Sequence, residues 1–155
     1  MKQVIIRKQE PVFIKQDTTR DHEVHTMPYI IIIDDDQNIR AILRAMLEDA
    51  GHEVDEAYDG HRGIELCRRR CPDIVITDIL MPGMDGIETI THIRKELPDV
   101  RVLAISGGGR ICADHYLKLA GNLGATRELS KPFSRKELIT EVDTLLKSSA
   151  QLSAI

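Results

Sequence analysis

The sequence predicts an α/β fold in which a doubly wound, five-stranded parallel sheet carries helices on both faces. Five short apolar or β-branched stretches alternate with five stretches of helical periodicity. The stretches 29–33 and 74–76 contain no charge, which is typical of strands covered on both sides. Helices between successive strands supply the right-handed crossovers that a parallel sheet requires.

Each element of the first half has a local signal. Residues 29–33 include four consecutive isoleucines and predict a buried strand. Asp36 can cap the helix that follows, which Gly51 ends. Residues 53–57 form a more polar strand, which indicates an edge position. A helix over 60–70 stops before Pro72. The first helix is expected to bury one apolar face, made of Ile39, Ile42, Leu43, Met46 and Leu47.

The second half repeats this alternation. A strand ends at Asp78 and is followed by a turn and a helix over 86–96. A strand over 100–105 leads through three glycines into a helix over 111–123. The short fifth strand, 126–130, precedes Ser134 and Glu137, a capping box that begins the last helix. The fourth helix is expected to bury Tyr116, Leu117 and Ala120.

Length and composition indicate one soluble domain. The chain has 155 residues, 42% of them hydrophobic and 30% charged. We expect a mobile polar leader over 1–28, the domain over 29–147 and a short tail over 148–155. The net charge of −4 argues against a nucleic-acid surface, and apolar runs of only a few residues argue against a membrane span. The arginine run 68–70 is expected to lie at the negative end of a helix dipole.

Three cysteines and no signal peptide favour a reducing, cytoplasmic location. Cys67 and Cys71 lack the two-residue spacing of a redox or zinc pair. We expect both to be ordinary packing residues.

Polar side chains follow four of the predicted strands, where each strand ends. They are residues 34–36 (three aspartates), Asp78, Ser106 and Lys131. In an open α/β sheet the carboxyl ends of the strands share one edge, where ligands bind. Each residue also has an ordinary role to play alone, as a helix cap, a turn residue or a solvated lysine. Their coincidence at the strand ends favours a common site.

That site suits phosphoryl chemistry. Carboxylates about 4 Å apart repel by roughly 4 kcal/mol per pair at an effective dielectric of 20. Mg²⁺ offsets such repulsion and prefers oxygen ligands. Lys131 adds a positive charge and Ser106 a hydroxyl donor. The set predicts a carboxylate that receives a phosphoryl group whose charge is then compensated.

Four motifs together resemble the receiver domain of bacterial response regulators. In order along the chain they are IIIIDDDQNIR, DIVITDILMPGMDG, VLAISGGG and LSKPF. The resemblance extends from Tyr29 to about Lys147 and implies a flavodoxin-like strand order 2-1-3-4-5. It also implies a single-domain regulator that is not an enzyme in the usual sense: it takes its phosphoryl group from a sensor histidine kinase or histidine phosphotransfer protein.

The resemblance assigns roles to single residues. Asp78 would be the phosphoacceptor, and Asp34, Asp35, Asp78 and the backbone carbonyl of Leu80 would hold Mg²⁺. Ser106 would bind a phosphoryl oxygen, and Lys131 would pair with Asp78 and then with its phosphate. The Lys131–Pro132 bond is expected to be cis. A downstream protein would bind the fourth helix, fifth strand and fifth helix; the alternative output is relay of the phosphate to another histidine protein.

The chain departs from the family in two places. Glu128 stands where the family usually has a switch aromatic, and burial of its charge would be costly. We therefore expect a different switch, a loop over 107–110 that becomes ordered on phosphorylation. Leu80 and Gly108 flank the expected acyl phosphate, and neither side chain can position a water, so we predict slow self-dephosphorylation.

Two other readings stay open at this stage. A haloacid-dehalogenase-type phosphatase would use Asp34 as nucleophile and Asp36 as general acid, although it would also need acids late in the chain. A pseudo-receiver would bind partners and never gain phosphate.

Overall fold

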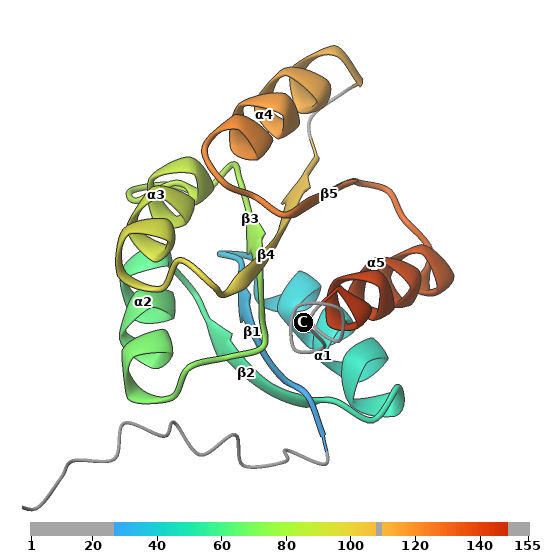
Figure 1. Cartoon of the computed structure of the whole chain (residues 1–155). Helices are drawn as coiled ribbons and strands as arrows, with labels where there is room; N and C mark the ends of the chain where they lie inside the picture. Colours follow the sequence, from blue (N-terminus) through green and yellow to red (C-terminus); the bar gives the residue numbers. More distant parts are fainter. Residues whose placement is uncertain (1–26, 108–109, 149–155) are drawn as a thin grey trace, which may run out of the picture.

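Five parallel strands form one sheet with five helices packed against it (Figure 1). The computed structural model describes residues 27–107 and 110–148. The strands are β1 (Tyr29–Ile33), β2 (Glu53–Ala57), β3 (Ile74–Asp78), β4 (Arg101–Ser106) and β5 (Arg127–Ser130). The helices are α1 (Gln37–Asp49), α2 (Gly60–Arg69), α3 (Gly86–Glu96), α4 (Arg110–Asn122) and α5 (Arg135–Lys147). The strand order is β2-β1-β3-β4-β5, which confirms the predicted order and the edge position of β2.

The sheet separates two apolar cores. In β1, Ile31 and Ile33 join the core under α2, α3 and α4, whereas Ile30 and Ile32 join the core under α1 and α5. Successive side chains of a strand point to opposite faces, so a strand of isoleucines serves both cores at once. The sequence of β1 therefore follows from its place in the middle of a covered sheet.

The register of the central strands aligns their carboxyl ends. Ile33 of β1 pairs with Thr77 of β3, and Asp78 of β3 pairs with Ile105 of β4. All five residues of β3 are buried. The chain therefore leaves β1, β3 and β4 at the same edge of the sheet, side by side.

The predicted helix ends are confirmed. Asp36 caps α1, and Ser134 and Glu137 form a capping box at α5. Gly51 has a φ of 89° after α1, a conformation that glycine adopts without a steric cost. The Lys131–Pro132 bond is cis, as expected.

Three predicted burials are wrong. Ile42 on α1 is 51% exposed and Tyr116 on α4 is 38% exposed, while Cys71 also lies at the surface. Helical periodicity defines an apolar arc, but the sheet covers only part of that arc, and Ile42 and Tyr116 lie at its margin. Cys71 lies beyond Arg69, the last residue of α2. Cys67 is buried as predicted.

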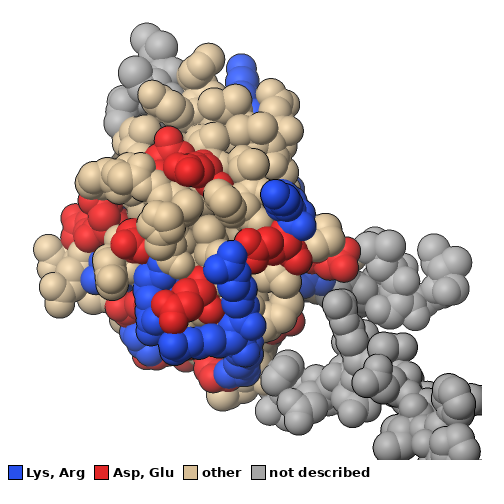
Figure 2. Space-filling model, turned by 90° about the vertical axis from the view of Figure 1, so that its left-hand side faces the viewer, with Lys and Arg blue, Asp and Glu red and all other residues tan. Residues whose placement is uncertain are grey.

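Positive and negative side chains lie interspersed in the lower half of the face that Figure 2 shows. Glu65 pairs with Arg62 and Arg69 on α2. The other two arginines of the run 68–70 reach across to neighbouring elements, Arg68 to Glu96 and Arg70 to Glu53. The arginine run thus forms ion pairs in addition to lying at the end of α2.

Residues 1–26 and 149–155 lie outside the described residues, and so do most of the predicted leader and tail. Among the described helices, none combines the length and the apolar character that crossing a bilayer requires.

Candidate functional site

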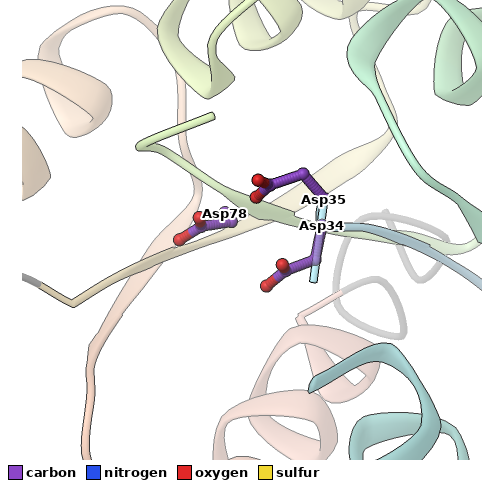
Figure 3. Close-up of side chains that lie close together, drawn as sticks. All are labelled: Asp34, Asp35 and Asp78. Atoms are coloured by element: carbon purple, nitrogen blue, oxygen red, sulfur yellow. The ribbon is translucent and has the colours of Figure 1, made fainter. Parts of the chain in front are cut away.

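Three carboxylates meet at the carboxyl edge of the sheet (Figure 3). Asp34 and Asp35 directly follow β1, and Asp78 is the last residue of β3. One carboxylate oxygen from each lies within 4.8 Å of the others. Strands that neighbour each other in the sheet thus bring together acids more than forty residues apart in the chain.

Asp34 is held firmly in this cluster. Its side chain is 3% exposed, and its Oδ1 accepts a hydrogen bond of 2.9 Å from the backbone amide of Asp36. Its Oδ2 accepts one of 3.1 Å from Lys131 Nζ. Both carboxylate oxygens are therefore fixed in direction.

Lys131 bridges two of the acids. Its Nζ lies 3.1 Å from Asp34 Oδ2 and 3.4 Å from Asp78 Oδ1. The backbone amide of Lys131 donates to the carbonyl of Ser106 at 2.8 Å, so the end of β4 positions the lysine. One ammonium group therefore contacts two acids of a cluster of three carboxylates, so the site has more negative than positive groups.

Asp78 is buried and its pKa is correspondingly high. The pKa of Asp78 is raised to about 6, chiefly by desolvation; the charges of Asp34 and Asp35 add to this rise, and Lys131 opposes it. Thr77 Oγ1 donates to the backbone carbonyl of Asp78 at 3.0 Å. The backbone of Asp78 is thus fixed at the end of β3, while its carboxylate contacts Lys131.

Ser106 carries a buried hydroxyl. Its side chain is 0% exposed, and among the described residues its Oγ makes no hydrogen bond. An unsatisfied buried hydroxyl costs about 1–3 kcal/mol, which a ligand oxygen could recover. Ser106 ends β4, the strand next to Asp78.

The donor set fits a hard divalent cation. Three carboxylates offer oxygen ligands, and Asp35 is exposed, which gives an ion access from solvent. Leu80, whose carbonyl is a further predicted ligand, lies two residues after Asp78 with its side chain 39% exposed.

Two conspicuous acids lie outside the cluster. Asp36 turns toward α1, where its Oδ1 accepts from the amides of Asn38 and Ile39. Glu128 is exposed on β5 next to α4, where a Cβ on Gly121 would lie 2.2 Å from its Oε1. The loop residues 108 and 109, including Gly108, lie outside the described residues.

Sequence reasoning missed two residues that support the site. Arg40 donates from Nη1 to the carbonyl of Asp34 at 2.7 Å. Gly86 packs so tightly on β3 that a Cβ there would lie 2.1 Å from the carbonyl oxygen of Asp78. An arginine in a helix and a glycine at a helix start carry no signal of such contacts, because the partners lie beyond the i±4 spacing of a helix and meet only through the path of the connecting loop.

A family model described as the response regulator receiver domain matches residues 30–143. This chain belongs to that family. The match spans every element from β1 to most of α5 and includes all residues of the acidic cluster. The resemblance inferred from the four motifs is thereby confirmed, and the receiver family consists of phosphoacceptors rather than enzymes in the usual sense.

Known relatives share the fold at moderate identity. A probable transcriptional regulator, ycf27 of Guillardia theta, is 36% identical over 127 residues, which cover 82% of this chain and 48% of that protein. The crystal structure of NtrX from Brucella abortus superposes with a TM-score of 0.76 at 30% identity, over 82% of this chain and 28% of that one. The chemotaxis response regulator CheY4 of Vibrio cholerae gives a TM-score of 0.69 at 28% identity, over 77% of this chain and 99% of that one.

The chain spans about half the length of the curated regulator that it matches. The similarity therefore concerns the receiver region of that protein. The similarity shows that this chain is a receiver domain of two-component signalling and has the receiver fold. The acidic cluster is an observation of the structure itself.

Proposed function

We propose that this chain is a response regulator that accepts a phosphoryl group on Asp78 from a phosphohistidine, with Mg²⁺ as its cofactor. The supporting observation is Lys131 Nζ, which lies 3.1 Å from Asp34 and 3.4 Å from Asp78 at a cluster of three carboxylates. A buried carboxylate beside a lysine and an acidic, cation-binding pair is suited to receive a phosphoryl group.

In the proposed reaction a carboxylate oxygen of Asp78 attacks the phosphorus atom. The bond from phosphorus to the donor histidine nitrogen breaks, and the nitrogen keeps the electron pair. Lys131 compensates the charge on the transferred oxygens, and the buried hydroxyl of Ser106 donates to one of them. Asp34, Asp35, Asp78 and the Leu80 carbonyl would hold Mg²⁺, which when bound neutralises the carboxylates and the phosphoryl oxygens.

The donor in this proposal is a sensor histidine kinase or a histidine phosphotransfer protein, and the output is a protein contact through α4, β5 and α5. Exposed apolar side chains on α4 support that surface: Tyr116 and Leu119 are each 38% exposed and Leu123 after the helix is 39% exposed. Apolar groups gathered at a surface favour protein contact. We also propose a cytoplasmic location, which the odd number of cysteines, three, and the free, buried thiol of Cys67 support.

The orientation of Asp36 disfavours the phosphatase reading. A phosphatase of the haloacid-dehalogenase type would need Asp36 as a general acid beside the nucleophile Asp34. Asp36 instead binds two amides of α1 through its Oδ1. Its carboxylate is therefore occupied as a helix cap.

Labelling with acetyl phosphate tests the proposal. The full chain, incubated with acetyl phosphate and Mg²⁺, is expected to gain one phosphoryl group by intact mass, and EDTA or Asp78→Ala should abolish the gain. Asp85→Ala is the matched control, because Asp85 lies seven residues further on and caps α3. Labelling that survives Asp78→Ala, or continuous turnover of a phosphomonoester, would contradict the proposal.

We further propose that the acyl phosphate is long-lived. Leu80 has no group that can orient a water, and Gly108 has no side chain. The label on the isolated protein is expected to persist for minutes at room temperature, and Leu80→Asn should shorten its lifetime. Loss of the wild-type label within seconds would refute this.

A further inference from the structure

Arg40 connects the acidic cluster to the edge strand β2. It lies in the first turn of α1, and its side chain is only 13% exposed. Its Nη1 donates to the carbonyl oxygen of Asp34 at 2.7 Å, and its Nε lies 3.6 Å from Glu56 Oε2. One guanidinium therefore contacts both the backbone after β1 and a carboxylate on β2.

The carbonyl that Arg40 binds belongs to the peptide between Asp34 and Asp35. The orientation of this peptide plane sets the direction in which both side chains leave the backbone. On the other side of the same residue, the amide of Asp34 donates to the carbonyl of Ala57 at 3.2 Å. Arg40 and β2 thus hold this short segment from both ends.

The second partner of Arg40 is itself anchored. Glu56 is 25% exposed and also pairs with Arg44 Nη1 at 3.2 Å. Arg44 lies one turn after Arg40 on α1, and its Nη2 donates to the carbonyl of Val54 at 2.8 Å. Because Glu56 belongs to β2, which pairs with β1 in the sheet, it can fix the guanidinium of Arg40 from there. A planar guanidinium with several N–H donors can meet both demands at once.

We propose that Arg40 is a positioning residue for the cation site, which orients the Asp34–Asp35 peptide so that both carboxylates face Asp78. This rests on the proposed function, because it concerns the affinity of the same site for Mg²⁺. Arg40 touches no carboxylate of the cluster through its side chain and acts through the backbone. Residues that orient metal ligands typically change metal affinity about 10–100-fold when removed.

Calorimetric titration of the full chain with MgCl₂ tests this without any phosphodonor. Arg40→Ala is expected to raise the Mg²⁺ Kd at least about tenfold. Arg44→Ala is the matched control, because it removes a neighbouring arginine with the same partner Glu56 but no contact to Asp34. Its Kd should stay within about twofold of wild type, even though it loses its ion pairs with Glu48 and Glu56.

Unfolding midpoints of both variants, measured without metal, separate positioning from general stability. Equal losses of stability with unequal losses of Mg²⁺ affinity would support the inference. If Arg40→Ala does not fold, Arg40→Lys replaces it, and its single nitrogen should restore the affinity only in part. Equal Mg²⁺ affinities in the Arg40 and Arg44 variants would overturn the inference alone, whereas a wild-type protein that binds no Mg²⁺ would overturn the proposed function as well.

Discussion

Burial dominates the behaviour of Asp78. The residue is 8% exposed, and its pKa is raised from 3.8 to about 6, chiefly by desolvation. Near neutral pH, the metal-free protein therefore keeps a charged carboxylate in a place that disfavours it. The free-energy cost of burying this charged carboxylate comes from Asp78 alone, and it is present before any ligand binds.

This cost predicts a pH-dependent effect of Asp78→Asn. Because the folded pKa lies above the unfolded value, the stability that protonated Asp78 contributes is full below about pH 3.8 and is lost as the pH rises through about 6. The variant cannot ionise there, so its free energy of unfolding relative to wild type should rise by up to about 3 kcal/mol between pH 4 and 8. Urea unfolding in EDTA measures this, and a constant difference between the two proteins would contradict it.

At the scale of elements, two helices begin close in sequence to the acidic cluster. α1 begins with Asp36 as its cap, and α3 begins with Asp85 and Gly86 after the loop that leaves β3. Each cap uses a carboxylate that lies close in sequence to the acidic cluster but serves the helix. Position in the sequence alone therefore does not distinguish the acids that cap helices from the acids that form the site.

Asp36→Ala should weaken α1 without removing the phosphoacceptor. Loss of the two cap contacts is expected to cost about 1 kcal/mol of unfolding free energy. Labelling by acetyl phosphate should continue, because the amide of residue 36 still binds Asp34. Asp36→Asn, which can still cap, is the control. Complete loss of labelling in a folded Asp36→Ala protein would show that Asp36 takes part in the chemistry.

Alanine substitutions at Gly86 and Gly121 should have different effects, although both glycines lie close to other atoms. A Cβ at Gly86 would lie 2.1 Å from the Asp78 carbonyl oxygen and 2.5 Å from Ile79 Cα, which are backbone atoms of the site. Gly86→Ala should therefore destabilise the protein by about 1–3 kcal/mol and reduce labelling of Asp78. Gly121→Ala meets only the end of the exposed Glu128 side chain and should leave both properties nearly unchanged. Similar effects of the two substitutions, measured by urea unfolding and labelling, would refute the contrast.

At the scale of the whole molecule, the site exists only when the sheet is formed. Asp34 and Asp35 come from the end of β1, Asp78 from β3, and Lys131 from the segment after β5. No single element holds more than two of the acids. Binding to this site is therefore coupled to the folding of the whole domain.

Mg²⁺ is accordingly expected to stabilise the fold. At one hundred times its Kd, it should raise the free energy of unfolding by about 2.7 kcal/mol, since the unfolded chain has no assembled site. Asp35→Asn removes the exposed ligand of the cluster and should abolish most of this gain while leaving the metal-free stability largely intact. Thermal unfolding with and without Mg²⁺ measures both, and an equal gain in the variant would argue against Asp35 as a ligand.

Much of the architecture was predictable because local signals and the fold agree. Uncharged β-branched strands, helix caps and glycines that end helices all gave elements close to those observed. The predictions that were wrong concern exposure: Ile42 and Tyr116 lie at the edges of the buried faces of their helices, and Cys71 lies at the surface. Periodicity assigns a face to a helix, but the width of that face depends on which neighbours pack against it.

By itself, the sequence determined that acids, a hydroxyl and a lysine follow successive strands, and that those strands form a parallel sheet with one common edge. Only the tertiary structure decided which of the acids converge, turning Asp34 and Asp35 toward Asp78 and Asp36 toward its own helix. It also decided the raised pKa of Asp78 and the contact of Arg40 with the Asp34 carbonyl. The physical reason is that desolvation and hydrogen-bond geometry depend on atoms that the fold brings together. A local sequence pattern carries no information about which atoms these are.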